Sequence, residues 1–179
     1  MARLVVAWLV EQGWTVYQEV TTRGGQRADI VARRDPVLWV IECKLGLSLA
    51  VLGQALGWIG YANMVSVATE TTPRGAALEA TRWLIKRSSI GHLRVGSESI
   101  YEDEPARLLR RTSDRLRKAL REEHRTFAPA GNAASSYWSP YQATCKALRD
   151  EVRQAPGCSL REAIARIEHH YASPASARG

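Results

Sequence analysis

The stretch GGQRADIVARRDPVLWVIECK, from Gly24 to Lys44, contains two short apolar runs separated by Arg-Asp-Pro. Both runs are rich in valine and isoleucine, which favour extended strands, and a proline between them is typical of a tight turn. The stretch therefore predicts a hairpin of the strands RADIVAR and VLWVIECK. The first strand contains Asp29, and the second ends in Glu42, Cys43 and Lys44.

Strand geometry predicts where these polar side chains point. Side chains alternate between the two faces of a strand, so Glu42 and Lys44 share one face while Cys43 points to the other. A short hairpin loop with an even number of residues would place Asp29 opposite Val40 and diagonal to Glu42. We therefore expect Asp29, Glu42 and Lys44 on one face of the hairpin.

Two neighbouring carboxylates and a lysine indicate metal-dependent hydrolysis. Carboxylates a few Å apart repel each other unless a divalent cation neutralises them. Oxygen ligands of this kind, including the Cys43 backbone carbonyl, suit Mg²⁺ or Mn²⁺. Such a metal would activate water and stabilise charge on a phosphoryl oxygen, and Lys44 would either orient that water or balance the charge of the pentavalent intermediate. The alternative is a strand that simply ends in charge at the solvent, because a Glu-x-Lys pattern alone is common.

The flanking sequence predicts the other elements of a mixed α/β domain. Apolar residues at helical spacing predict a helix over residues 2–12, and WTVYQEV predicts a strand before the hairpin. Beyond the hairpin, Ser48 is expected to cap a helix that ends near residue 62. NMVSVATE predicts a strand, PRGAALEATRWLIKRS a helix that begins with its proline, and IGHLRVG a last edge strand. The domain is expected to span residues 1–100.

The second half of the chain predicts a helical appendage. YEDEPARLLRRTSDRLRKALREEHR has acidic residues before its proline and many arginines after it, which is typical of a long exposed helix. FAPAGNAASS has the composition of a linker, so residues 101–136 are expected to form a basic helix and a linker. Residues 137–172 predict two short helices with capping patterns at Ser139 and Ser159. These would form either a helix-turn-helix or a protein-docking hairpin.

Composition favours a soluble protein with a polyanionic partner. The 179 residues include 25 Lys and Arg against 18 Asp and Glu, a net charge of +7 that suits nucleic acid. The three cysteines are scattered and lack metal-type spacing, which predicts a reducing, cytoplasmic setting. No apolar run approaches the ~20 residues that span a bilayer, so no membrane association is expected.

With this order of elements, an aspartate in the second strand and IECK ending the third, residues 2–100 resemble the PD-(D/E)xK nuclease superfamily. The resemblance implies a restriction-endonuclease-like αβββαβ core, a mixed central sheet flanked by helices, followed here by an all-α appendage. It also implies Mg²⁺-dependent hydrolysis of DNA in bacterial or phage repair, recombination or restriction. Asp29 and Glu42 match the metal-binding acids of the superfamily, and Lys44 matches its catalytic lysine.

The chain departs from the superfamily pattern in its first helix. Many members place a glutamate early in that helix, where this chain has Ala2. Glu19, at the end of the first strand, is expected to act as the substitute acid in preference to Glu11. An inactive nuclease-fold protein that binds DNA or serves in assembly is therefore the alternative function. A homodimer, and a protein partner on the C-terminal helices, stay open.

Further substrate contacts are expected beside the hairpin and on the helix that follows it. In some superfamily members a glutamine and an aromatic residue follow the lysine, and Gln54, Trp58 and Tyr61 stand at helical spacing here. Gln54 is expected to bind substrate, and the two aromatic residues are weaker candidates for stacking on a base. Arg23 and Arg27 flank the hairpin and are expected to contact phosphates.

Overall fold

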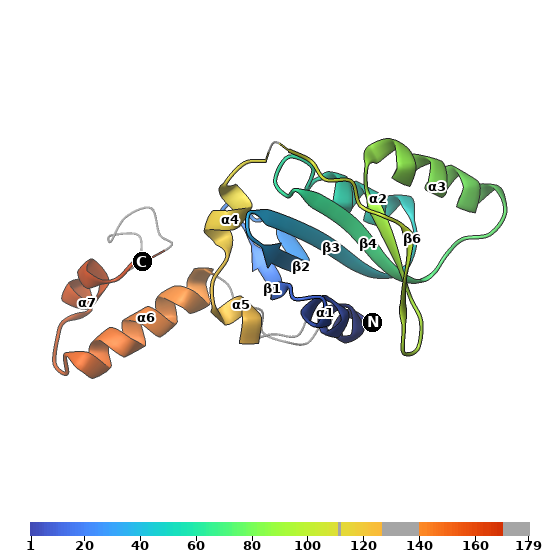
Figure 1. Ribbon diagram of the computed structural model, residues 1–179. Coiled ribbons are helices and arrows are strands. Elements are labelled where there is room, and N and C mark those ends of the chain that lie inside the picture. The colour runs from blue at the N-terminus through green and yellow to red at the C-terminus, as the bar shows by residue number, and fades with distance from the viewer. Residues whose placement is uncertain (111, 127–139, 170–179) are drawn as a thin grey trace. The chain divides into compact units, whose positions relative to one another are not determined.

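The computed structural model describes residues 1–110, 112–126 and 140–169 (Figure 1). The chain divides into two compact units, Met1–Tyr137 and Trp138–Gly179. The first unit is a mixed α/β structure with one six-stranded sheet flanked by helices, and the second is helical. Within the described residues, no helix is both long and apolar enough to cross a membrane.

The elements of the first unit begin in the predicted order of helix, three strands, helix, strand, helix and strand. They are α1 (Ala2–Glu11), β1 (Thr15–Thr21), β2 (Arg27–Arg34), β3 (Val37–Gly46), α2 (Leu49–Leu56), β4 (Met64–Thr71), α3 (Ala76–Ser88), β5 (Gly91–Val95), β6 (Ile100–Glu104), α4 (Arg115–Ala119) and α5 (Glu123–Thr126). The strands lie in chain order across the sheet. Strands β1 to β3 are antiparallel, β4 and β5 run parallel to β3, and β6 is antiparallel to β5. Because β6 pairs with it, β5 is not the predicted edge strand.

Two apolar clusters hold helices against the two faces of the sheet. On one face, which we call the α2 face, Leu52 of α2, Ile85 of α3 and Leu116 of α4 pack in the same cluster as Val40. On the other face, α1 packs in a second cluster that includes Ile41 of β3. Figure 1 shows α1 on the opposite side of the sheet from α2 and α3. Burial of both faces explains the nearly continuous apolar runs in the central strands.

The hairpin has the predicted strands but a different register. Arg34 pairs with Val37, so the turn consists of Asp35 and Pro36, and Val31 pairs with Val40. The prediction that Asp29 lies opposite Val40 is therefore wrong. Proline has no N–H to donate to a strand ladder, which favours its place in the turn. If this register is continued by one residue beyond the Ile30–Ile41 pair, Asp29 lies directly opposite Glu42.

Helices α2 and α3 differ from their predicted bounds. The Ser48 hydroxyl accepts a hydrogen bond from the Val51 N–H and caps α2 as predicted. The helix ends at Leu56, however, and the chain then turns and buries Trp58. Helix α3 begins at Ala76 rather than at the proline three residues earlier. The shorter α2 leaves Trp58 in the turn that follows the helix.

The single long helix predicted over residues 101–125 is wrong. Residues Ile100–Glu104 form β6, and the two short helices α4 and α5 follow. Leu116 of α4 is fully buried, and α5 packs against β1. A charged segment can pair at a sheet edge, where its side chains stay in solvent. The first unit therefore extends beyond the predicted boundary at residue 100.

Replacing Leu116 with alanine is expected to destabilise the protein by about 2–5 kcal/mol, because a fully buried leucine leaves a cavity when it is truncated. The matched control is Leu108→Ala, which removes a leucine that is 60 % exposed and should change stability by less than about 0.5 kcal/mol. Urea unfolding measures both values. Equal small losses would mean that residues 105–126 do not pack on the sheet.

The second unit contains α6 (Pro140–Gln154) and α7 (Leu160–Arg166). The predicted cap at Ser159 is confirmed, since its hydroxyl accepts from the Glu162 N–H while the Glu162 carboxylate accepts from the Ser159 N–H. The predicted cap at Ser139 lies outside the described residues. An ion pair of 3.1 Å between Arg166 and Glu151 joins the two helices. The docking or DNA-binding role of this unit stays a prediction.

Candidate active site

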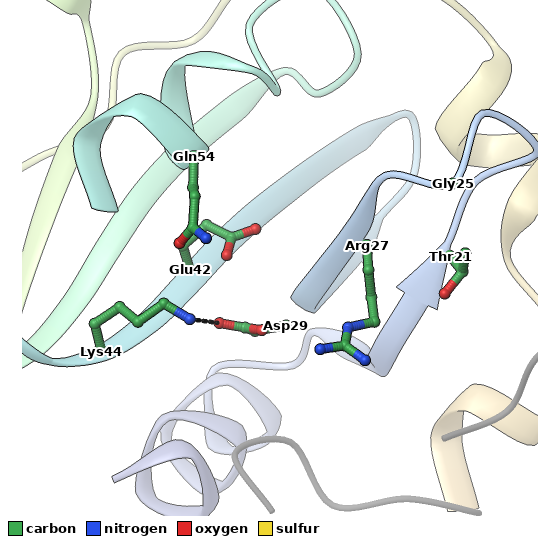
Figure 2. A pocket seen from close by; sticks show the side chains of 7 residues that line it. All are labelled: Thr21, Gly25, Arg27, Asp29, Glu42, Lys44 and Gln54. Carbon is green, nitrogen blue, oxygen red and sulfur yellow. Dashed lines mark ion pairs between the residues drawn. The ribbon is translucent and has the colours of Figure 1, made fainter. Parts of the chain in front are cut away.

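A polar pocket of about 370 Å³ opens on the α2 face of the sheet (Figure 2). Its lining comes from β1, β2, β3, α2 and the loop between β1 and β2. The lining residues are Thr21, Gly25, Arg27, Asp29, Glu42, Lys44 and Gln54. The structure thus gathers three of the predicted catalytic residues, without Glu19, and two of the predicted substrate contacts.

Asp29 is fixed by a backbone hydrogen bond from the neighbouring strand. Its Oδ2 accepts a hydrogen bond of 2.8 Å from the Cys43 N–H. The same oxygen lies 4.0 Å from the Lys44 Nζ, and the Asp29 side chain is 14 % exposed. The β2–β3 pairing ends at Ile30 and Ile41, so the Asp29 carboxylate replaces a backbone acceptor at this point. One oxygen of the carboxylate is thereby oriented without loss of access to the pocket.

Glu42 is the buried acid of the pair. Glu42 is only 3 % exposed. Its Oε1 accepts a hydrogen bond of 2.7 Å from the Trp58 Nε1. Burial, and secondly the negative charge of Asp29, raise the pKa of Glu42 to about 7, although the Trp58 hydrogen bond opposes the shift. A cation in the pocket would favour the ionised form of both carboxylates.

Trp58 is a residue whose role sequence analysis missed. It was a candidate for stacking on a base, but it is 1 % exposed and packs in the apolar cluster of the α2 face. The Tyr61 ring contacts it edge-on, with 6.2 Å between ring centroids. A buried indole N–H requires an acceptor, and the signal in the sequence was a tryptophan sixteen residues after an acid on an apolar strand. Trp58 therefore positions Glu42.

Glu19 lies beside the pocket rather than in its lining. It is buried, and its Oε2 lies 3.1 Å from the Arg27 Nε. Its φ of +52° is left-handed, which is uncommon for a non-glycine residue. Glu19 thus contacts Arg27, one of the residues that line the pocket. Arg23 is exposed in the loop between β1 and β2 and does not line the pocket.

The donor set fits a small hard cation. Within the described residues, no group of three or more His, Cys, Asp and Glu side chains gathers as a metal site. Mg²⁺, however, is commonly held by one or two carboxylates, with waters and substrate phosphates completing its coordination. Asp29 and Glu42 supply such a pair. The Cys43 side chain packs on the opposite face, and burial raises the pKa of its thiol, so only its backbone carbonyl stays a predicted ligand.

No known protein family model matches the chain, and no curated protein matches it. Among solved structures, the chain is similar to the SPO1766 protein of unknown function from Silicibacter pomeroyi. The TM-score is 0.46 and the identity 17 %, over 84 % of this chain and 87 % of that chain. This degree of similarity assigns neither a family nor an activity.

Proposed function

We propose that the chain is a metal-dependent deoxyribonuclease with a restriction-endonuclease-like core that hydrolyses DNA phosphodiester bonds. The observation that carries the proposal is the convergence of Asp29, Glu42 and Lys44 on one open polar pocket. Two strands supply these residues, and the element order α, β, β, β, α, β supports the same assignment. Bacterial or phage repair, recombination or restriction is the proposed setting.

The residues of the pocket take distinct roles in this proposal. Asp29 and Glu42 hold Mg²⁺ or Mn²⁺, with Trp58 fixing one Glu42 oxygen. When bound, the metal supplies Lewis acidity for the attacking water and for the scissile phosphate. The Lys44 ammonium donates to that water and orients it. The carboxylates thereby bind the cation, and the lysine acts on the nucleophile.

The rim of the pocket suits a phosphate group. Arg27 lines it and is held by Glu19, so its guanidinium is oriented while its side chain stays 46 % exposed. Thr21 also lines the pocket, but its hydroxyl oxygen is buried and forms no hydrogen bond with any described residue. Gln54 of α2 adds an amide to the opposite side of the opening (Figure 2). A phosphodiester oxygen would accept hydrogen bonds from the Arg27 guanidinium and the Gln54 amide.

The second candidate function is a nuclease-fold protein that binds DNA without cutting it. The pairing of Glu19 with Arg27 favours it, because this pairing removes the substitute acid from the lining of the pocket. Such a protein would bind DNA equally well with Mg²⁺ and with EDTA.

The proposal is tested by cleavage of linear, nicked and branched DNA in Mg²⁺ and in EDTA. We expect cutting in Mg²⁺ only, and loss of cutting in Asp29→Asn. Calorimetry should show one Mg²⁺ site in the wild-type protein that the variant lacks. The proposal fails if cutting survives in Asp29→Asn, or if Mg²⁺ does not bind at all.

A further inference from the structure

Helix α3 presents a large aromatic side chain to solvent. Trp83 is 64 % exposed, although tryptophan is highly buried on average. The opposite side of the helix is packed, because Thr81 and Ile85 are buried. Trp83 is therefore not needed to hold α3 on the sheet. An indole left in water in this way favours contact with a partner.

Three cations surround Trp83 on the outward side of α3. Arg82, Lys86 and Arg87 are all exposed. Lys86 and Arg87 lie three and four residues after Trp83 and so neighbour it on the helix, and Arg82 lies four residues before Lys86. The acid on this side of the helix is Glu79, four residues before Trp83. Among the described residues, no carboxylate lies within ion-pair distance of Arg82 or Arg87. Lys86 lies 3.9 Å from Glu104, and both are partly in solvent. We call Arg82, Trp83, Lys86 and Arg87 the Trp83 surface.

Many other arginines of the first unit are engaged by the protein itself. Their partners are Asp35 for Arg33 and Arg117, Asp103 for Arg94, Glu122 for Arg125, and the backbone carbonyls of Lys118 and Leu120 for Arg121. Within the segment after residue 105, Arg117 and Arg125 thus pair with carboxylates, and Arg121 bonds to carbonyls. The Trp83 surface combines an exposed aromatic ring with two arginines that form no ion pair with any described residue, which complements a polyanion.

We propose that the Trp83 surface binds single-stranded DNA, with Trp83 stacked on an unpaired base and the three cations at neighbouring phosphates. Stacking on a ring requires an exposed base face, which a continuous duplex does not offer. Helix α3 packs beside α2 on the α2 face, so a strand that leaves the pocket past Gln54 and crosses α2 comes to α3 (Figure 1). The inference rests on the proposed nuclease function and names its substrate class, DNA with an unpaired stretch.

The test is fluorescence anisotropy with the full-length chain in EDTA, using a labelled oligothymidylate and a blunt duplex. Trp83→Ala should weaken binding of the oligothymidylate by about 5- to 100-fold, the effect of losing one base stack. It should leave duplex binding unchanged, and Trp83→Phe should restore most of the affinity. The double variant Lys86→Ala, Arg87→Ala should reduce the salt slope of log K by about 1.4.

The matched control is Tyr101→Ala. Tyr101, like Trp83, is an exposed aromatic residue. The Arg94 guanidinium lies over the Tyr101 ring, but an ion pair with Asp103 neutralises this arginine. We expect no change in oligothymidylate affinity for this variant. The inference is overturned if Trp83→Ala leaves the affinity for oligothymidylate unchanged. It is also overturned if the variant changes the mass of the protein in solution and not its affinity for oligothymidylate. Because binding is measured without metal, its result is independent of whether the chain cuts DNA.

Discussion

Replacing Lys44 with alanine is expected to lower kcat for DNA cleavage by about 10²- to 10⁴-fold, the range for loss of a group that transfers or orients a proton. Mg²⁺ affinity should stay the same or rise. The Lys44 Nζ lies 4.0 Å from Asp29 Oδ2, and its side chain is 44 % exposed, so it faces both a metal ligand and the solvent. Its removal takes away a positive charge that competes with the metal for Asp29.

The measurement combines single-turnover cleavage with calorimetric titration of Mg²⁺. The matched control is Lys118→Ala, which removes an exposed lysine from α4, outside the pocket lining, with the same change in net charge. Asp29→Asn should lose both Mg²⁺ binding and cleavage, and Lys118→Ala should lose neither. Wild-type cleavage in Lys44→Ala, or loss of its Mg²⁺ binding, would contradict the role assigned to Lys44.

The gathering of Asp29, Glu42 and Lys44 was predictable because it depends only on strand alternation. Any register that pairs residues of the correct parity puts these side chains on one face. The register itself depends on which two residues occupy the turn, and the strand pattern does not distinguish a turn at Arg34–Asp35 from one at Asp35–Pro36. The structure therefore has Asp29 level with Glu42 rather than diagonal to it.

Features that depend on tertiary packing were not predictable from local pattern. The acidic and basic run after residue 100 has the composition of an exposed helix, but Ile100–Glu104 finds a pairing partner in β5. Helical spacing suggested that Trp58 faces the substrate, because α2 was expected to continue past it. The helix ends at Leu56, and the following turn directs the Trp58 indole to Glu42.

Replacing Glu42 with glutamine is expected to abolish Mg²⁺-dependent cleavage and, at the same time, to stabilise the metal-free protein above pH 7. Burial and the charge of Asp29 raise the pKa of Glu42 from 4.5 to about 7. The folded protein therefore binds a proton at Glu42 more tightly than the unfolded chain does. Glutamine cannot ionise, and it keeps an oxygen that can accept from the Trp58 N–H.

The direction of the pH dependence follows from this difference in proton affinity. The stability contributed by the proton is fully present below pH 4.5 and is lost as the pH rises through about 7. Each tenfold difference in proton affinity corresponds to about 1.4 kcal/mol, so ionisation of Glu42 costs the metal-free protein about 3 kcal/mol across this window. The variant Glu42→Gln does not undergo this loss.

Urea unfolding in EDTA at pH 5 and pH 8 measures the effect, with Glu98→Gln as the control at an exposed acid. Glu42→Gln should be more stable than wild type at pH 8, with the difference much smaller at pH 5, and Glu98→Gln should match wild type at both. Mg²⁺ at pH 8 should stabilise only proteins that retain both carboxylates, because a cation that binds the folded state alone raises its stability. If Mg²⁺ leaves wild-type stability unchanged at pH 8, Glu42 is a buried acid without a metal, and the DNA-binding alternative takes precedence over the nuclease.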